Sequence, residues 1–149
     1  MTLALTIDEL RDAGEREVGV SGWHRIEQER IDLFADATDD HLWIHTDPAR
    51  AAAGPFGTTV AHGYCTLSLL PMLLREVLEV TDAGVRINYG IDKIRFTAPV
   101  PSGAEIRVAA RLAGAEPRGD GVVYKVAVRV EVKGQEKPAL VGEVLYAVF

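Results

Sequence analysis

The sequence predicts an α+β fold in which a curved antiparallel sheet wraps around one long buried helix. Two observations carry this prediction. Residues 63–80 are apolar on nearly every side, which is typical of a helix buried all round. The second half of the chain contains several runs in which apolar and polar residues alternate, as they do in strands. With 149 residues, one domain over residues 1–149 is expected.

The first forty residues predict a helix, a strand and a second helix. Thr6 and Glu9 have the spacing of a capping box, so a short helix is expected over residues 7–13, ending at Gly14. A strand with a Ser-Gly break is expected over residues 17–26. From residue 28 onward, apolar residues recur at helical spacing, and this helix leads to the acidic pair Asp39 and Asp40.

The next segment brings a carboxylate and an imidazole close together in the sequence. A short apolar stretch over residues 42–44, expected to be extended, separates Asp40 from His45. Carboxylate and imidazole are the usual pair for moving protons near neutral pH. Asp47 followed by Pro48 predicts the start of a short helix through residue 53.

The remaining residues predict the buried helix and the rest of the sheet. The helix over residues 63–80 should be kinked at Pro71, which lies too deep for a first turn. The strand that begins near residue 85 should carry a bulge near Gly90, where the alternation changes phase. A hairpin is expected at Gly119, and the last run, residues 140–149, should be covered on two sides or lie in a subunit contact.

Composition excludes several classes of protein. The net charge of −6 gives a nucleic-acid-binding role no electrostatic support. The longest apolar segment contains Thr66, Ser68 and Pro71 and is shorter than the roughly 20 residues that a bilayer requires. The lone Cys65 rules out an intrachain disulfide, and the N-terminus lacks the pattern of a signal peptide. We therefore expect a cytoplasmic protein that binds neither nucleic acid nor membrane.

Ten residues between positions 34 and 63 form an ordered motif with fixed spacing. They are Phe34, Ala35, Thr38, Asp40, Ile44, His45, Asp47, Pro48, His62 and Gly63. The motif resembles the hydratase signature of the MaoC-like (R)-specific enoyl-CoA hydratases, which have the hotdog fold. Three positions depart from that signature: Asp39 replaces a glycine, Leu42 replaces an amide residue, and Trp43 replaces a proline.

This resemblance implies syn hydration of a trans-2-enoyl thioester, on coenzyme A or a carrier protein, to the (3R)-hydroxyacyl thioester. Asp40 and His45 would be the catalytic pair around one water molecule. The Gly63 backbone N–H would hold the thioester oxygen, and His62 and Tyr64 are further candidates for substrate binding. The resemblance also implies a homodimer and no cofactor.

Other interpretations of the same residues remain open. Asp40 could cap a helix, His45 and His62 could be buried structural histidines, and Gly63 could serve tight packing. His41 and His45 have metal-ligand spacing on a helix, but the expected extended conformation argues against a metal site. The alternative functions are a hotdog acyl-CoA thioesterase and a non-catalytic acyl-thioester-binding protein whose departures at Asp39 and Leu42 have abolished turnover.

Overall fold

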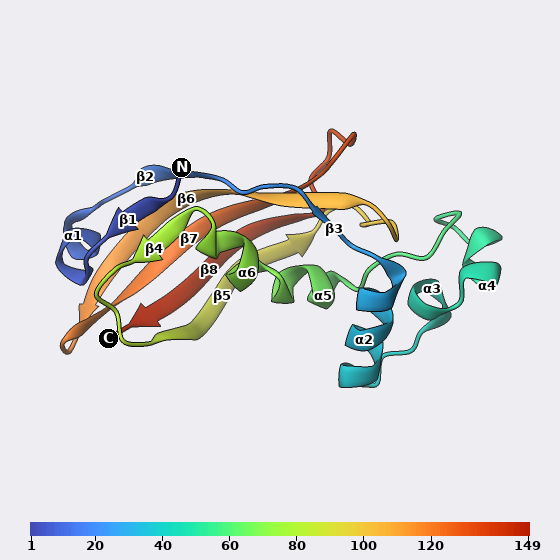
Figure 1. The fold of residues 1–149 in the computed structure, drawn as a ribbon, viewed down its shortest axis with the longest axis horizontal. Helices are drawn as coiled ribbons and strands as arrows, with labels where there is room; N and C mark the ends of the chain where they lie inside the picture. The colour runs from blue at the N-terminus through green and yellow to red at the C-terminus, as the bar shows by residue number, and fades with distance from the viewer.

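The structure, a computed structural model, describes all residues from 1 to 149, and its main sheet is antiparallel. The strand order is β2-β6-β7-β8-β5, and β3 pairs with β6 beyond β2. The strands are β2 (Arg16–Val20), β3 (His24–Arg25), β5 (Arg86–Phe96), β6 (Glu105–Arg118), β7 (Gly121–Val132) and β8 (Leu140–Val148). Figure 1 shows them as one long, curved sheet, which confirms the expected α+β layout.

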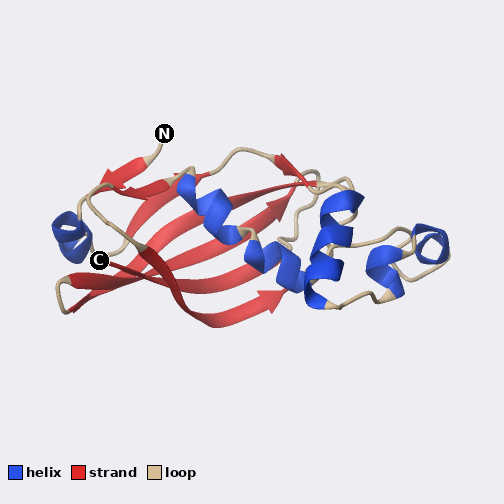
Figure 2. Cartoon of the chain, turned by 60° about the horizontal axis from the view of Figure 1, so that its bottom comes forward, coloured by secondary structure: helices blue, strands red, loops and turns tan.

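Two helices in line, α5 (Gly63–Ser68) and α6 (Leu70–Arg75), lie along one face of this sheet (Figures 1 and 2). Leu70, Leu73 and Leu74 are fully buried there among the valines of β7 and the aliphatic residues of β6. Burial of such side chains against the sheet supplies the main stabilising free energy, about 1.5–3 kcal/mol for each.

The prediction of one helix over residues 63–80 was too long and too continuous. The chain breaks at Leu69 because Pro71 has no N–H to donate to the preceding turn, whereas proline fits the first turn of a new helix. Residues 78–80 form a strand, β4 (Leu78–Val80), which pairs in parallel with β1 (Leu3–Leu5). The helices are also not buried on all sides, since Tyr64 is 67% exposed.

Several local predictions are confirmed. Thr6 and Glu9 form the reciprocal capping box of α1 (Ile7–Asp12), and Gly14 follows with a φ of 61°. The register between β5 and β8 shifts between Asn88 and Gly90, at the expected bulge. Strand β8 lies between β7 and β5, so both of its edges are paired, but Val141 and Leu145 remain partly exposed and the expected cover on both faces is not seen within one chain.

Three helices extend beyond the end of the sheet (Figures 1 and 2). They are α2 (Gln28–Thr38), α3 (Trp43–Thr46) and α4 (Pro48–Ala52). Helix α2 confirms the prediction from its apolar spacing, with Ile31 and Ala35 fully buried. Helix α4 begins as expected, because the Asp47 carboxylate accepts a hydrogen bond from the Arg50 amide at 3.0 Å.

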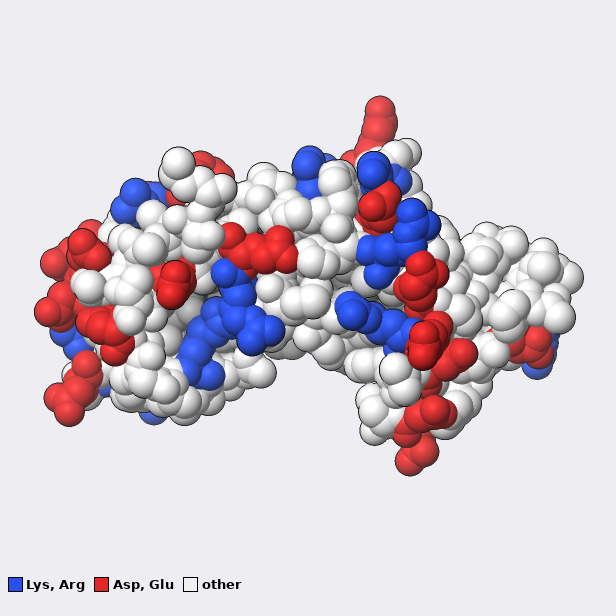
Figure 3. All heavy atoms as spheres, in the orientation of Figure 1, with Lys and Arg blue, Asp and Glu red and all other residues white.

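Acidic side chains gather over α1 and along α2 on the face shown in Figure 3, while basic side chains form separate small groups. This distribution fits the net charge of −6 and provides no continuous basic surface on that face. None of the helices is both long enough and apolar enough to cross a membrane.

Candidate active site

The end of α2 sets the position of Asp40. Ile31 and Ala35 anchor the helix, and Asp39 ends it in the left-handed conformation, with a φ of 56°. Aspartate adopts this conformation more readily than most residues, so Asp39 can occupy a position where the family signature has glycine. The chain then leaves the helix axis, and Asp40 lies exposed at the turn.

His45 belongs to α3, a single helical turn where an extended segment was expected. Three bonds close this turn: the His45 N–H donates to Leu42 O at 2.9 Å, Asp47 N–H donates to Trp43 O at 3.0 Å, and the Thr46 hydroxyl donates to the His41 carbonyl. Trp43 anchors the turn against Gly54, where a Cβ would lie 2.9 Å from the indole ring.

The His45 ring is buried, with 8% of the residue exposed. Its Nδ1–H donates to the Val60 carbonyl at 2.6 Å, which leaves Nε2 as the nitrogen with a free lone pair. Burial lowers the pKa of His45, the Val60 hydrogen bond raises it, and His62 lowers it again. Because the lowering prevails, His45 is neutral near pH 7 and can accept a proton.

His62 connects the two residues that the motif singled out. Its ring stacks on His45, with centroids 3.8 Å apart and planes at 25°. Its Nε2–H donates to the backbone carbonyl of Asp40 at 2.9 Å, and its Nδ1 is buried without a partner. With 3% of its surface exposed, His62 supports Asp40 and His45 from behind.

The structure therefore brings Asp40, His45 and His62 together, with one polar atom of each side chain within 4.8 Å of the others. The Asp40 carboxylate lies on the solvent-exposed side of this cluster, and the imidazoles of His45 and His62 lie on its buried side. His41 is not part of this cluster, because its ring bonds to the Asp36 carboxylate at 2.9 Å on the surface. The spacing of these three side chains would also suit a metal ion, the alternative against which the expected extended segment had argued.

Gly63, the next residue after His62, is the first residue of α5, so its N–H has no partner within the helix. A Cβ at this position would lie 2.7 Å from the Phe96 ring, which shows that tight packing requires glycine here. Beside Gly63 lies a hollow of about 310 Å³ with a largely apolar lining from Ile44, Val60, Ala61, Thr66 and Phe96.

Tyr64 lies apart from this cluster. It is 67% exposed, and its ring meets the edge of Phe96 with centroids 5.7 Å apart.

Gln28 supports the position of His45, a role that the sequence analysis did not predict. The Gln28 amide donates to the His45 carbonyl at 2.7 Å and accepts a hydrogen bond from the Thr59 hydroxyl. No local pattern signals this role, because 17 and 31 residues separate Gln28 from its partners.

Comparison with known proteins defines the class of this fold and site. The family model described as "MaoC like domain" matches residues 10–134. The chain belongs to the MaoC-like family, has its hotdog fold, and is an enzyme of the hydratase and dehydratase class.

Individual relatives agree with this assignment. The chain is 51% identical over 139 residues to 3-hydroxyacyl-thioester dehydratase Z of Mycobacterium tuberculosis, covering 93% of this chain and 92% of that protein. It is 42% identical over 128 residues to nodulation protein N of Rhizobium leguminosarum bv. viciae, covering 84% and 80%. The (R)-hydratase from A. caviae involved in PHA biosynthesis superposes with a TM-score of 0.70 at 26% identity, covering 87% and 95%.

Proposed function

We propose that this protein catalyses the reversible (R)-specific hydration of trans-2-enoyl-CoA to (3R)-hydroxyacyl-CoA, or of the same acyl groups on a carrier protein. The observation that carries the proposal is the convergence of Asp40 and His45 on His62, the residue that precedes the free amide of Gly63. The similarity to a 3-hydroxyacyl-thioester dehydratase and to an (R)-hydratase supports the substrate class. We also propose that residues 1–149 act as one domain.

The geometry suits a single water molecule between two proton acceptors, the Asp40 carboxylate and Nε2 of His45. Asp40 takes a proton from the water as its oxygen bonds to C3, while His45 holds that oxygen in line. The electron pair of the double bond moves toward the thioester oxygen, and the proton then passes to C2 on the same face. Water is thereby added across the double bond with syn geometry, and Asp40 is regenerated.

Gly63 has the proposed role of stabilising the negative charge that develops on the thioester oxygen. Its N–H stands at the positive end of α5, and a preorganised donor of this kind acts where charge appears in the transition state. The apolar hollow beside Gly63 would exclude bulk water from the enolate. We assign His62 to the support of Asp40 and His45, and we place Tyr64 at the rim near Phe96.

Hydration of crotonyl-CoA, followed by loss of the enoyl thioester absorbance, tests this function. Asp40→Asn and His45→Gln should each lower kcat by about 10²–10⁴, because each removes a group that handles the proton or the water. Asp36→Asn and His41→Gln are matched controls, since this neighbouring pair makes the same chemical change on the surface. Chiral analysis of the product should show the (3R) alcohol. Hydration by Asp40→Asn and His45→Gln at the parental rate would refute the assignment.

The same reaction mixtures separate the two alternatives. A thioesterase would release free thiol from the substrate, whereas hydration releases none. A binding protein without turnover, an alternative favoured by Leu42 and by the similarity to nodulation protein N, would bind enoyl-CoA without consuming it.

A further inference from the structure

A row of polar side chains crosses the sheet beneath the junction of α5 and α6. Asn88 on β5 lies opposite Tyr146 on β8, and Tyr146 lies opposite Tyr124 on β7. Tyr124 is 1% exposed and Tyr146 is 3% exposed. The residues two positions away along β7 and β8 are buried valines, so this row interrupts an apolar surface. These valines are Val122, Val126, Val144 and Val148.

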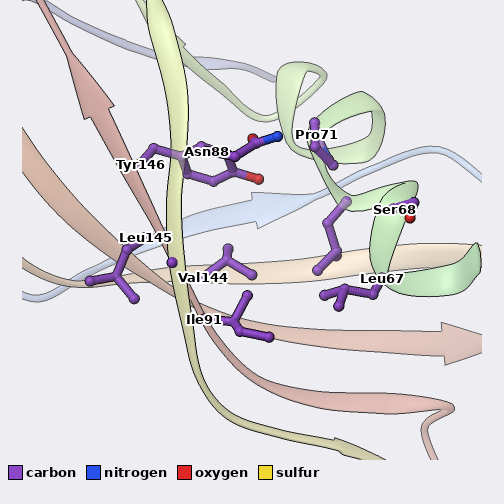
Figure 4. Close-up of a pocket in the computed structure, with 10 residues that line it drawn as sticks. Leu67, Ser68, Pro71, Asn88, Ile91, Val144, Leu145 and Tyr146 are labelled. Carbon is purple, nitrogen blue, oxygen red and sulfur yellow. The ribbon is translucent and has the colours of Figure 1, made fainter. Parts of the chain in front are cut away.

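The polar row lacks the hydrogen bonds that such groups normally make. No hydrogen bond of good geometry reaches the buried Tyr124 hydroxyl, and a buried polar atom left unpaired costs about 1–3 kcal/mol. Burial raises the pKa of Tyr124, and the nearby Arg86 opposes this rise. Burial raises the pKa of Tyr146 to about 12, so its hydroxyl remains a neutral donor. Figure 4 shows the Tyr146 hydroxyl and the Asn88 amide directed toward the helices near Pro71.

Arg86 adds a positive charge to this row. Its guanidinium lies 4.9 Å from the Tyr146 ring centroid, and it donates to the Pro71 carbonyl at 3.2 Å. Arg86 is half-buried, and it belongs to none of the ion pairs of the chain. A guanidinium in such a position normally pairs with a carboxylate, and in an acidic protein a partner from the chain itself would be easy to supply.

Next to this row is a hollow of about 290 Å³, here called the elbow hollow, between the two helices and strands β5 and β8. Its apolar walls include Leu67, Leu70, Ile91 and Val144, and Tyr146 and Asn88 line it as well. Arg86 lines an adjoining hollow of about 690 Å³, which shares Pro71 and Asn88 with the elbow hollow. The volume of the elbow hollow is large enough for the end of an acyl chain rather than for a single bridging water molecule.

The elbow hollow lies along the same helices that begin at the proposed thioester site. Leu67 comes one turn after Gly63, and the eight steps from Gly63 to Pro71 span roughly 12 Å at 1.5 Å per residue. An acyl chain held by its thioester at Gly63 and running beside α5 would therefore bring its far end to the polar row.

We propose that the elbow hollow receives the far end of the acyl chain, and that Arg86 and the polar row bind a carboxylate at that end. This inference rests on the proposed function and specifies its substrate class as enoyl thioesters that end in a carboxylate. Such an end group would accept hydrogen bonds from Arg86, Tyr146 and Tyr124, and a methyl end would leave them unpaired.

The test compares enoyl-CoA substrates of equal chain length that end either in a methyl group or in a carboxylate, over a series of lengths. At the length that spans the elbow hollow, the wild type should show kcat/KM roughly tenfold higher for the carboxylate, because charged hydrogen bonds are the stronger kind. Arg86→Met should reduce this ratio to about one, and Arg86→Lys should retain part of it. Arg118→Met is the matched control and should keep the parental ratio, because Arg118 is an exposed arginine that also lies over a tyrosine ring, that of Tyr89, outside both hollows.

A wild type without preference at any length, or a preference that survives in Arg86→Met, would overturn the proposal. If Arg86→Met does not fold, Tyr146→Phe and Tyr124→Phe remove the hydroxyls with little change of shape, and the ratio should fall in both. Crotonyl-CoA is too short to reach the row, so its hydration tests the proposed function alone. If it is not hydrated, calorimetric binding of saturated acyl-CoA with and without a terminal carboxylate still tests the end-group site.

Discussion

At the residue level, His62 links the two proposed catalytic side chains by two different contacts. It donates a hydrogen bond to the Asp40 carbonyl and stacks on the His45 ring, and only 3% of its surface is exposed. Both contacts hold Asp40 and His45 at a fixed separation, which is what positioning a single water molecule requires.

Replacing His62 should therefore impair turnover more than substrate binding. We expect His62→Leu to lower kcat at least tenfold with a small change in KM, since one hydrogen bond and one ring contact each contribute about 1 kcal/mol. His62→Gln can still donate to the Asp40 carbonyl and should recover part of kcat. Steady-state kinetics measures the effect, and an unchanged kcat in His62→Leu would show that the contacts have no catalytic role.

The buried state of His45 predicts how stability depends on pH. Its pKa in the folded protein lies below the value of 6.5 for an unfolded chain, so the unfolded state takes up the proton first as pH falls. The contribution of His45 to the free energy of unfolding is therefore complete above pH 6.5 and is lost as pH decreases toward the lower folded pKa.

Denaturant unfolding at a series of pH values below 6.5 measures this effect. The wild type should lose stability more steeply than His45→Gln, whose side chain cannot take up a proton. The exposed His41→Gln is a contrasting variant: the Asp36 hydrogen bond raises the pKa of His41, so the folded state takes up this proton first, and the variant should lose stability more steeply than the wild type as pH falls. Identical pH dependence in wild type and His45→Gln would contradict the expectation.

At the level of secondary structure, the start of α5 depends on close contact with the end of β5. The Phe96 ring covers Gly63 so tightly that a Cβ would lie 2.7 Å away. The proposed oxyanion site and the packing of the helix onto the sheet therefore depend on the same glycine.

Gly63→Ala should lower the free energy of unfolding by about 1–3 kcal/mol, as overpacking of a tight contact does. Adding Phe96→Leu in the same chain should restore part of this loss, because the smaller side chain gives the methyl group room. Gly90→Ala, where a Cβ meets nothing within 4 Å, is the control. Thermal and denaturant unfolding provide the measurement, and a Gly63→Ala protein of parental stability would refute the argument.

At the level of the whole molecule, one edge of the sheet predicts association. Strand β5 pairs only with β8, and it exposes a run of large apolar side chains. These are Ile87, Tyr89 and Ile91, with Val85 just before the strand, each 47–53% exposed. An open, apolar edge strand invites pairing with another chain, so we propose that two copies join through β5 into a homodimer.

Sedimentation velocity can test this arrangement with two matched variants. Ile87→Lys places a charge on β5 and should shift the protein toward the monomer, because a buried charge opposes the pairing. Val20→Lys places the same charge on β2 at the opposite edge, at a similar exposure of 50%, and should leave the dimer intact. A parental sedimentation coefficient in Ile87→Lys would exclude β5 as the interface.

Local patterns in the sequence were sufficient for much of this fold. The capping box at Thr6, the apolar spacing of α2, the start of α4 at Asp47 and the bulge near Gly90 all depend on residues a few positions apart. Periodicity and capping act over one or two turns, which is why such elements can be predicted without coordinates. The motif likewise singled out Asp40, His45 and His62, whose side chains lie together in the structure, and Gly63, which follows His62 at the start of α5.

The other features of the fold and of the site depend on contacts between residues that are distant in the sequence. The bonds from Gln28 to His45 and from His62 to Asp40, and the contact of Phe96 with Gly63, join segments 17 to 33 residues apart. The break at Leu69, the pairing of β4 with β1 and the polar row at Tyr146 also emerge only when strands and helices pack. Short-range periodicity contains no information on such partners, because their proximity follows from the path of the whole chain.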